Sequence, residues 1–219
     1  MIEFVFMLTR DDVTVAHAPA VLSEVRRSGL RYVGFKDVGP PPHVLAEVTA
    51  AAHEAGMEVM LEVVSTSRED ELRSLSAART IGVDWVLGGT HAWEGSALLE
   101  GSVRYCPFAG TVSGHPSVLS GEIEAIADHA AALTVLDGVY GVDLLAYRHE
   151  SADPVALTRA VAAAAHGPVI AAGSVASLEQ VARLEDAGAW GFTIGTAIFE
   201  RALPGGPSVA GQVEAVLRG

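Results

Sequence analysis

The chain has 219 residues, of which 50% are hydrophobic and 19% are charged, so a sizeable core is expected and disorder is disfavoured. Its net charge is −13 and its longest basic run is Arg26-Arg27, which excludes the positive stripe needed to bind nucleic acid or an anionic membrane. Cys106 is the only cysteine, so no disulfide forms within the chain. The first apolar run contains Glu3 and is too short to span a membrane, which predicts a strand and a cytoplasmic protein, not a signal peptide.

Eight short apolar runs alternate with longer segments of helical pattern. The runs are residues 3–8, 32–35, 58–64, 84–88, 105–108, 141–147, 168–172 and 191–195. They are mostly continuous and rich in β-branched and aromatic residues, as in parallel strands covered on both faces. Helices are predicted at residues 18–29, 42–56, 67–82, 177–188 and 208–219, and several of them end in glycine. Ser67 with Asp70, and Ser177 with Gln180, resemble helix-start capping patterns.

A βα unit that recurs eight times predicts an α/β fold, a single (βα)₈ TIM barrel domain over residues 1–219. The alternative is a doubly wound open sheet. That fold commonly carries a GxGxxG turn after its first strand, and this sequence has none.

The last two strands carry the most specific signal. Each predicted strand ends in a glycine followed by a hydroxyl residue, Gly173-Ser174 in one case and Gly195-Thr196 in the other. Barrel enzymes often bind phosphate after strands seven and eight, where glycine lets the backbone approach the anion and a short helix from Thr196 would point N–H groups at it. The alternative is that these are ordinary turn glycines.

The segments VIAAGSVAS and AGAWGFTIGTAIFE resemble the ribulose-phosphate-binding barrel superfamily, which includes isomerases, epimerases and decarboxylases of phosphorylated sugars. The resemblance implies that Gly173, Ser174, Gly195 and Thr196 hold a substrate phosphate. The sequence lacks the motif of each of these enzymes. Strand five has no acid of the kind that the isomerases use, and strand two reads GFKD where the epimerases have His-x-Asp. The decarboxylase pattern Asp-x-Lys-x-x-Asp is also absent. The motifs GFKD, LEVVS, GHP and DLLAYR resemble a poorly characterised barrel group.

Lys36 is the only lysine beside thirteen arginines, and it lies at the predicted mouth of strand two. An amine can lose a proton, so Lys36 is predicted to form a Schiff base with a carbonyl or to carry a proton. It can alternatively stay charged and polarise an enolate oxygen. Glu62 lies inside the apolar strand MLEVV, where a carboxylate is costly unless it has a partner. Glu62 is the candidate general base, with a structural ion pair as the alternative.

Two histidines are candidates for moving a second proton. His91 follows the Gly-Gly-Thr end of strand four, and His115 lies with Ser113 in the Gly-rich segment at residues 110–116, which is expected to cover the substrate. The alternative is a mobile loop with an incidental histidine.

Three further charged residues are predicted to line the pocket. Asp37 follows Lys36, and Arg148 would clamp a carboxylate or a second phosphate. Asp143 is either a pocket residue or a member of a structural pair low in the barrel. No HxH, HExxH or clustered Asp pattern is present, so neither a metal nor another cofactor is predicted.

These patterns predict a soluble enzyme that acts on a small phosphorylated sugar or related carbonyl metabolite through an enolate or a lysine imine, as an isomerase, epimerase or aldolase-like lyase. One alternative is a non-catalytic barrel that binds a phosphorylated metabolite. Another is a carbon–carbon or ring-forming synthase of specialised metabolism. No nucleic-acid or membrane partner is expected, and a homo-oligomer is left open.

Overall fold

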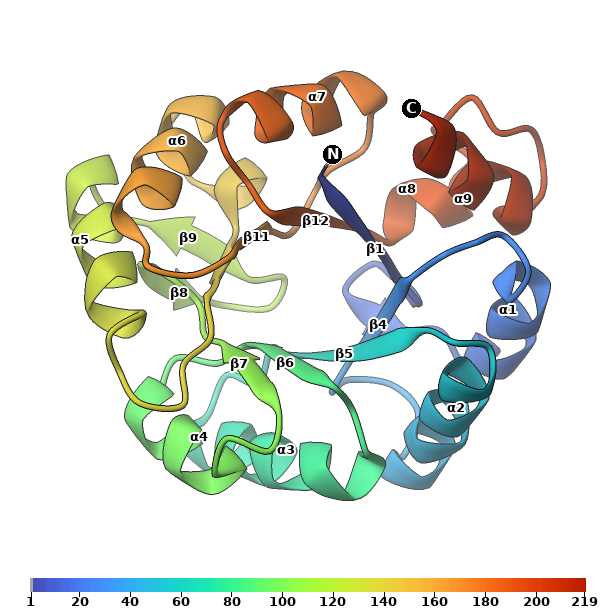
Figure 1. Cartoon of the computed structure of the whole chain (residues 1–219), viewed down its shortest axis with the longest axis horizontal. Coiled ribbons are helices and arrows are strands. Elements are labelled where there is room, and N and C mark those ends of the chain that lie inside the picture. Colours follow the sequence, from blue (N-terminus) through green and yellow to red (C-terminus); the bar gives the residue numbers. More distant parts are fainter. Residues whose placement is uncertain (1) are drawn as a thin grey trace.

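The structure is a computed structural model that describes residues 2–219, and its core is a ring of eight parallel strands (Figure 1). Around the ring the order is β10, β11, β12, β1, β4, β5, β6 and β7. Their bounds are β1 Glu3–Met7, β4 Tyr32–Lys36, β5 Glu58–Val63, β6 Trp85–Gly88, β7 Arg104–Cys106, β10 Val142–Leu144, β11 Val169–Ala171 and β12 Gly191–Ile194. Each strand falls within or overlaps one of the eight predicted runs, so the strand prediction is confirmed.

The ring closes where the first strand meets the last and where β7 meets β10. Strand β1 pairs with β12 from Glu3↔Gly191 to Phe6↔Ile194. Strands β7 and β10 are joined by a bridge between Phe108 and Asp143, where the Ala109 N–H donates to the Asp143 carbonyl and the Asp143 N–H donates to the Pro107 carbonyl, both at 2.9 Å. The (βα)₈ barrel is therefore confirmed, and the open doubly wound sheet is excluded.

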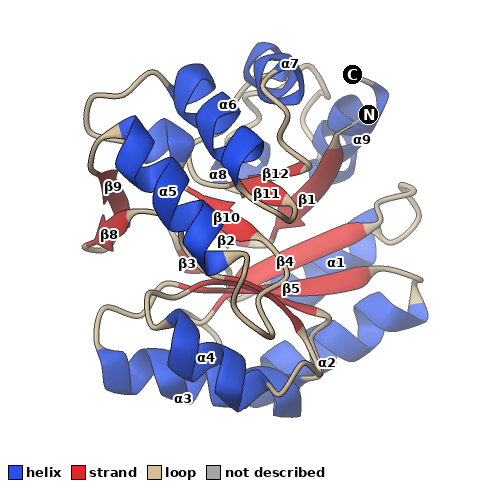
Figure 2. Cartoon of the chain, turned by 60° about the vertical axis from the view of Figure 1, so that its left-hand side comes forward, coloured by secondary structure: helices blue, strands red, loops and turns tan. Residues whose placement is uncertain are grey.

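Helices form an outer layer around the strands (Figure 2). They are α1 Ala18–Val25, α2 Pro42–Glu54, α3 Arg68–Ile81, α4 Ala92–Leu99, α5 Ile123–Leu133, α6 Pro154–Ala164, α7 Leu178–Asp186, α8 Thr196–Phe199 and α9 Val209–Arg218, with a 3₁₀ turn η1 at Ala146–Arg148. The Ser67 side chain accepts the Asp70 N–H at the start of α3, and Ser177 with Gln180 forms a capping box at α7, as predicted. Among residues 2–219, no helix is long and apolar enough to cross a membrane.

Two small hairpins lie outside the barrel ring and were not predicted. The first, β2 Thr9–Arg10 with β3 Val13–Thr14, turns at Asp11-Asp12, where both residues have positive φ (51° and 63°) as a type I′ turn requires. The second, β8 Thr111–Ser113 with β9 Val118–Ser120, occupies most of the segment predicted as a polar loop. It is attached to the barrel by a bridge between Leu119 and His149.

The barrel interior changes from apolar to charged along its axis. Near the N-terminal ends of the strands, Trp85 and Trp190 stack at 5.2 Å with Tyr32 edge-on to both. Aliphatic, methionine and cysteine side chains fill the middle, namely Val5, Met7, Met60, Leu87, Cys106 and Ile170. At the C-terminal ends, buried Lys36, Glu62 and Asp143 replace them. Because charged side chains are rarely buried without a function or a partner, this end holds the candidate site.

Candidate functional site

A cavity of about 720 Å³ opens at the C-terminal ends of the strands. Its lining includes Lys36, Glu62 and Arg148 together with Gly173, Ser174, Gly195 and Thr196. The structure therefore brings the lone lysine and both glycine-containing turns into one cavity. A hollow of about 740 Å³ lies at the opposite end, lined by Asp84, Arg104 and Tyr140 among others. In barrels that N-terminal end serves stability, so the first cavity is the candidate active site.

Lys36 is held as an ammonium ion between two carboxylates. Its side chain is 5% exposed, and its Nζ lies 2.8 Å from Asp12 Oδ1 and 3.3 Å from Glu62 Oε1. Burial lowers the pKa of this amine, but the carboxylates of Glu62 and Asp12 outweigh burial and hold the pKa above its ordinary value. The Thr14 hydroxyl accepts the Lys36 N–H at 2.8 Å and donates to the Lys36 carbonyl at 2.9 Å, which fixes the end of β4 to β3.

Asp12 links Lys36 to Arg148, and the sequence analysis did not select it. The Arg148 guanidinium contacts both Asp12 carboxylate oxygens, at 2.5 Å and 2.8 Å. Burial raises the pKa of Asp12, but hydrogen bonds from Arg148 and Lys36 with their charges lower it to about 2. The positive φ of Asp12 is a strained choice where glycine is usual, and it places the carboxylate between two cations. The acidic pair Asp11-Asp12, four and five residues after the end of β1, was the available signal.

Asp143 is fully buried, and neither carboxyl oxygen has a hydrogen-bond partner within residues 2–219. Burial raises the pKa of Asp143 well above its ordinary value, and the charge of Glu62 raises it further, against weaker opposing effects of Lys36 and Arg148. Burial and the charge of Glu62 therefore favour the protonated form of Asp143. Asp143 does not line the cavity. Among residues 2–219 it also forms no ion pair, so the structural pair given as its alternative role is not seen.

When Asp143 is protonated, the charges of the group balance. Asp12 and Glu62 are matched by Lys36 and Arg148, all within a connected set of contacts. Any proton taken up by Glu62 leaves this group with one net positive charge beside the cavity. Such a change favours an anion that forms there at the same moment.

The two glycine-containing turns need glycine for space. Gly173 has a φ of +76°, and a Cβ there would lie 2.7 Å from Arg148 Nε. Arg148 Nε also donates to the Ser174 hydroxyl at 3.2 Å, which places the guanidinium beside this turn. A Cβ on Gly195 would lie 2.5 Å from Thr9 Oγ1, so the backbone there is in close contact with the start of β2.

Helix α8 begins at Thr196, as predicted, directly after Gly195. The Thr196 hydroxyl accepts the Asp11 N–H at 3.1 Å, so it ties this turn to the first hairpin. The Arg148 guanidinium lies beside the Gly173-Ser174 turn, and the backbone of both turns is rich in amides. This end of the cavity is therefore chemically suited to an anion.

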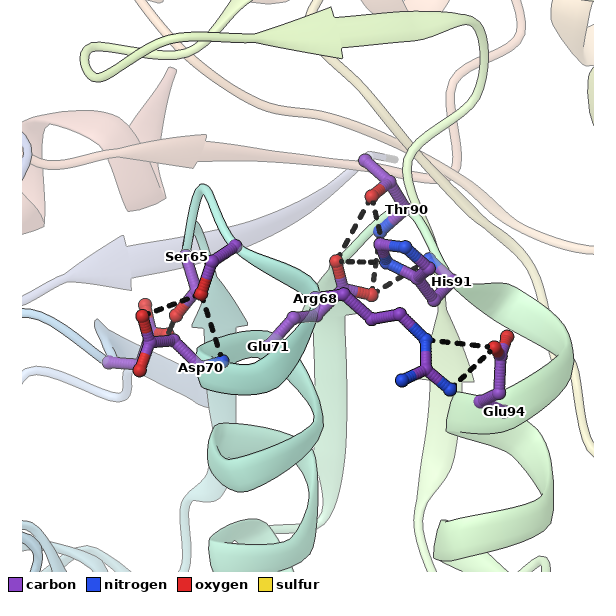
Figure 3. A network of polar contacts seen from close by, with 9 residues as sticks. Ser65, Arg68, Asp70, Glu71, Thr90, His91 and Glu94 are labelled. Atoms are coloured by element: carbon purple, nitrogen blue, oxygen red, sulfur yellow. Dashed lines mark hydrogen bonds and ion pairs between the residues drawn. The ribbon is translucent and has the colours of Figure 1, made fainter.

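Asp37 and His91 lie outside the cavity lining. Asp37 accepts the Val64 N–H at 2.9 Å and the Ser65 hydroxyl at 2.5 Å, which ties the ends of β4 and β5 together. His91 Nδ1 lies 2.9 Å from Glu71, a carboxylate that is only 1% exposed. Figure 3 shows Thr90 and His91 turned toward Glu71, which also accepts both of their backbone N–H groups. These contacts fix the loop after β6.

His115 and Ser113 are exposed residues of the β8–β9 hairpin, and neither lines the cavity. Pro116, Ser117 and Val118 of the same hairpin do line it. The hairpin thus reaches the cavity through residues 116–118, which directly follow the predicted His115. Among residues 2–219, no three His, Cys, Asp or Glu side chains are grouped to hold a metal ion.

Comparison with known proteins gives the fold. No protein-family model matches the sequence, and no curated protein matches it. Among solved structures, KDPGal aldolase in its native form is 19% identical with a TM-score of 0.69, covering 98% of this chain and 92% of its own. Phosphoribosylanthranilate isomerase from Thermotoga maritima is 14% identical with a TM-score of 0.67, covering 100% and 97%. Orotidine 5′-phosphate decarboxylase from Pyrococcus horikoshii OT3 is 14% identical with a TM-score of 0.65, covering 99% of both chains.

This chain has the fold of these barrels. The resemblance stated from the sequence is therefore confirmed at the level of the fold. At 14–19% identity, the reaction has to be argued from the residues of the cavity itself.

Proposed function

We propose that this protein is an enzyme that binds a small phosphorylated carbonyl metabolite and stabilises an enolate-type intermediate, as an isomerase, epimerase or aldolase-like lyase does. The observation that carries the proposal is the shared cavity. One end holds the Lys36–Glu62 pair, and the other holds the Gly173 and Gly195 turns with Arg148. A phosphate at the turns would fix the carbonyl end of the substrate near the pair.

Glu62 is the proposed general base. Its carboxylate lines the cavity and lies 3.3 Å from Lys36 Nζ. Removal of a C–H proton next to the carbonyl would place that proton on Glu62 and a negative charge on the substrate oxygen. Lys36, as an ammonium, would then lose one of its two carboxylate partners and would stabilise the oxygen anion. Return of the proton to the same carbon or to its neighbour completes an epimerisation or an isomerisation.

The ammonium role is favoured over a lysine imine. An imine needs a neutral amine, and both neighbouring carboxylates favour the charged form of Lys36. Borohydride added during incubation with ribulose 5-phosphate is therefore expected to leave the mass of the chain unchanged. A reduced adduct on Lys36 would replace the ammonium role by the imine.

Exchange of substrate hydrogen for deuterium tests the proposed function. We expect the wild-type protein in D₂O to incorporate deuterium next to the carbonyl of dihydroxyacetone phosphate or ribulose 5-phosphate, as measured by proton NMR. Glu62→Gln is expected to lower the exchange rate by about 10²–10⁴-fold. Glu58→Gln, at the opposite end of the same strand, is the matched control and is expected to keep the rate.

Lys36→Arg separates catalysis from binding. The proposal predicts loss of exchange with the fold retained, as judged by thermal denaturation. If both ketose phosphates bind and the wild-type protein exchanges neither, the non-catalytic binding barrel is the better description.

A further inference from the structure

Asp12 joins the two ends of the candidate active site. Both of its carboxylate oxygens contact the Arg148 guanidinium, at 2.5 Å and 2.8 Å, and its Oδ1 also accepts a hydrogen bond from Lys36 Nζ at 2.8 Å. Lys36 Nζ in turn lies 3.3 Å from Glu62 Oε1. Within residues 2–219, Arg148 has no direct hydrogen bond or ion pair to the Lys36–Glu62 pair, so Asp12 is the link.

The carboxylate of Asp12 is divided between its two cations. The same Oδ1 atom lies 2.8 Å from Lys36 Nζ and 2.8 Å from Arg148 Nη2. A carboxylate that bonds two cations takes a position between them, and release of one cation lets it move toward the other. The side chains of Asp12 and Lys36 are both 5% exposed, so little water screens the attraction between them. A ligand that draws Arg148 away therefore strengthens the hold of Asp12 on Lys36.

Arg148 is the member of this network that a ligand reaches most readily. Its side chain is 18% exposed, and its Nε donates to the Ser174 hydroxyl at 3.2 Å, beside one of the two glycine-containing turns. A guanidinium has five N–H donors, and three of them bond Ser174 and Asp12, which leaves two. A phosphate that bonds these two N–H groups competes with Asp12 for the same guanidinium.

The β2–β3 hairpin that carries Asp12 is fixed at both ends of the cavity. The Asp11 N–H donates to Thr196 Oγ1 at 3.1 Å, which ties the tip of the hairpin to the turn after β12. Thr14 Oγ1 accepts the Lys36 N–H at 2.8 Å, which ties the other end of the hairpin to β4. The φ of Asp12, 63°, is a costly conformation that persists because surrounding contacts hold it. The backbone therefore keeps the Asp12 carboxylate between its two partners.

We propose that Asp12 is a positioning residue that couples a phosphate bound at the two glycine-containing turns to the Lys36–Glu62 pair. A phosphate that engages Arg148 leaves Asp12 to Lys36. The ammonium then moves toward Asp12, and its hold on Glu62 weakens. Glu62 becomes the stronger base, so removal of a substrate proton is favoured when a phosphorylated ligand is in place. This inference rests on the proposed function and adds a means by which one end of the site regulates the other.

The Lys36 side chain reports this coupling directly. Lysine labelled with ¹³C at Cε gives one NMR signal, because Lys36 is the only lysine. Titration with inorganic phosphate is expected to move this signal until the site is saturated. Arg148→Gln without phosphate is expected to move it in the same direction, because both changes release Asp12 toward Lys36. In Asp12→Asn, phosphate should lose most of its effect on the signal.

Phosphate affinity separates coupling from a merely structural role. Since Asp12 competes with phosphate for Arg148, calorimetric titration of Asp12→Asn is expected to show at least about fivefold tighter binding of inorganic phosphate than wild type. If Asp12 only held the hairpin in place, its loss would loosen the site and weaken phosphate binding.

Asp11→Asn is the matched control. It removes the same charge from the same turn, but the Asp11 side chain is 77% exposed and pairs with Arg10. This variant should keep the response of the Lys36 signal to phosphate and should change phosphate affinity much less than Asp12→Asn.

Thermal denaturation establishes that each variant is folded. If phosphate binds the wild-type protein without moving the Lys36 signal, or if folded Asp12→Asn binds phosphate no more tightly, the inference is overturned and the phosphate site stands. If Asp12→Asn does not fold, Arg148→Gln decides, and a Lys36 signal at its wild-type position overturns the inference. If inorganic phosphate binds neither the wild-type protein nor Asp12→Asn, the phosphate site of the proposed function is wrong, and this inference fails with it.

Discussion

At the scale of the residue, Lys36 offers an unusual opportunity because it is the only lysine in the chain. Lysine labelled with ¹³C at Cε gives one side-chain NMR signal, which reports the charge of this amine directly. Since Glu62 and Asp12 raise the pKa of Lys36, we expect the signal to stay that of an ammonium through about pH 10.4, where an exposed lysine titrates. The stabilisation from this amine is fully present below that pH and is lost as pH rises through the folded-state pKa.

The same NMR signal measures how much each of the two carboxylates raises the pKa of Lys36. Glu62→Gln and Asp12→Asn each remove one favourable charge while burial remains, so each variant should lower the pKa of Lys36. Glu58→Gln is expected to leave it unchanged. A wild-type signal that titrates below pH 10 would contradict the assigned ammonium and would favour the imine.

Asp143 gives a second residue-scale prediction, through the pH dependence of stability. A carboxyl whose pKa is raised on folding stabilises the protein fully below its unfolded pKa, and that contribution is lost as pH rises toward the folded pKa. Asp143→Asn removes this dependence. We expect the free energy of unfolding of the variant, relative to wild type, to rise by about 1.4 kcal/mol per pH unit between the unfolded-state pKa, near 4, and the raised pKa of the folded state. Urea denaturation at pH 5, 6 and 7 measures it, and a difference that stays constant with pH would mean that Asp143 is ionised.

At the scale of the element, the strands and the two glycine-containing turns could be predicted because their signals are local. Continuous apolar runs identify the eight strands, and the glycines after β11 and β12 mark backbone positions with little room for a side chain. Lys36 and Glu62 could be selected because each is a charged residue at the end of, or within, an apolar strand. Strand register then places them opposite one another, at Lys36↔Glu62.

The remainder of the site depends on turn geometry and on long-range contacts. The Asp11-Asp12 turn lacks the Asn-Gly signature of a type I′ hairpin, so its sequence did not indicate that Asp12 turns back toward Lys36. His91 was selected by its position after β6, but Glu71, twenty residues earlier on α3, holds it to the loop. In the β8–β9 hairpin, the exposed His115 carried the chemical signal, whereas buried Ser117 lines the cavity.

At the scale of the whole molecule, a net charge of −13 opposes the approach of a phosphorylated ligand. The cations of the cavity do not reverse this field, because Lys36 and Arg148 are already matched by carboxylates. Exposed Glu150 and Glu200 add negative charge at the cavity lining. If the proposed phosphate binds, its attraction therefore has to come from short-range contacts at the turns, after the ligand has crossed a repulsive region.

Salt should consequently speed the association of ligand, the reverse of what is expected for an enzyme that attracts its substrate over long range. Raising ionic strength from 0.01 M to 0.15 M shortens the screening length from about 30 Å to about 8 Å, which removes most of the repulsion. We expect the association rate constant of ribose 5-phosphate, measured by stopped flow, to rise severalfold over this range. Glu150→Gln with Glu200→Gln should raise the rate at low salt and flatten its salt dependence. Glu47→Gln with Glu54→Gln, the same charge change on exposed positions of α2, should have a smaller effect because those charges lie away from the cavity. A rate that falls with salt would show that the turns and Arg148 present a positive potential beyond the cavity mouth, and the phosphate would then be drawn in over a distance before it is bound.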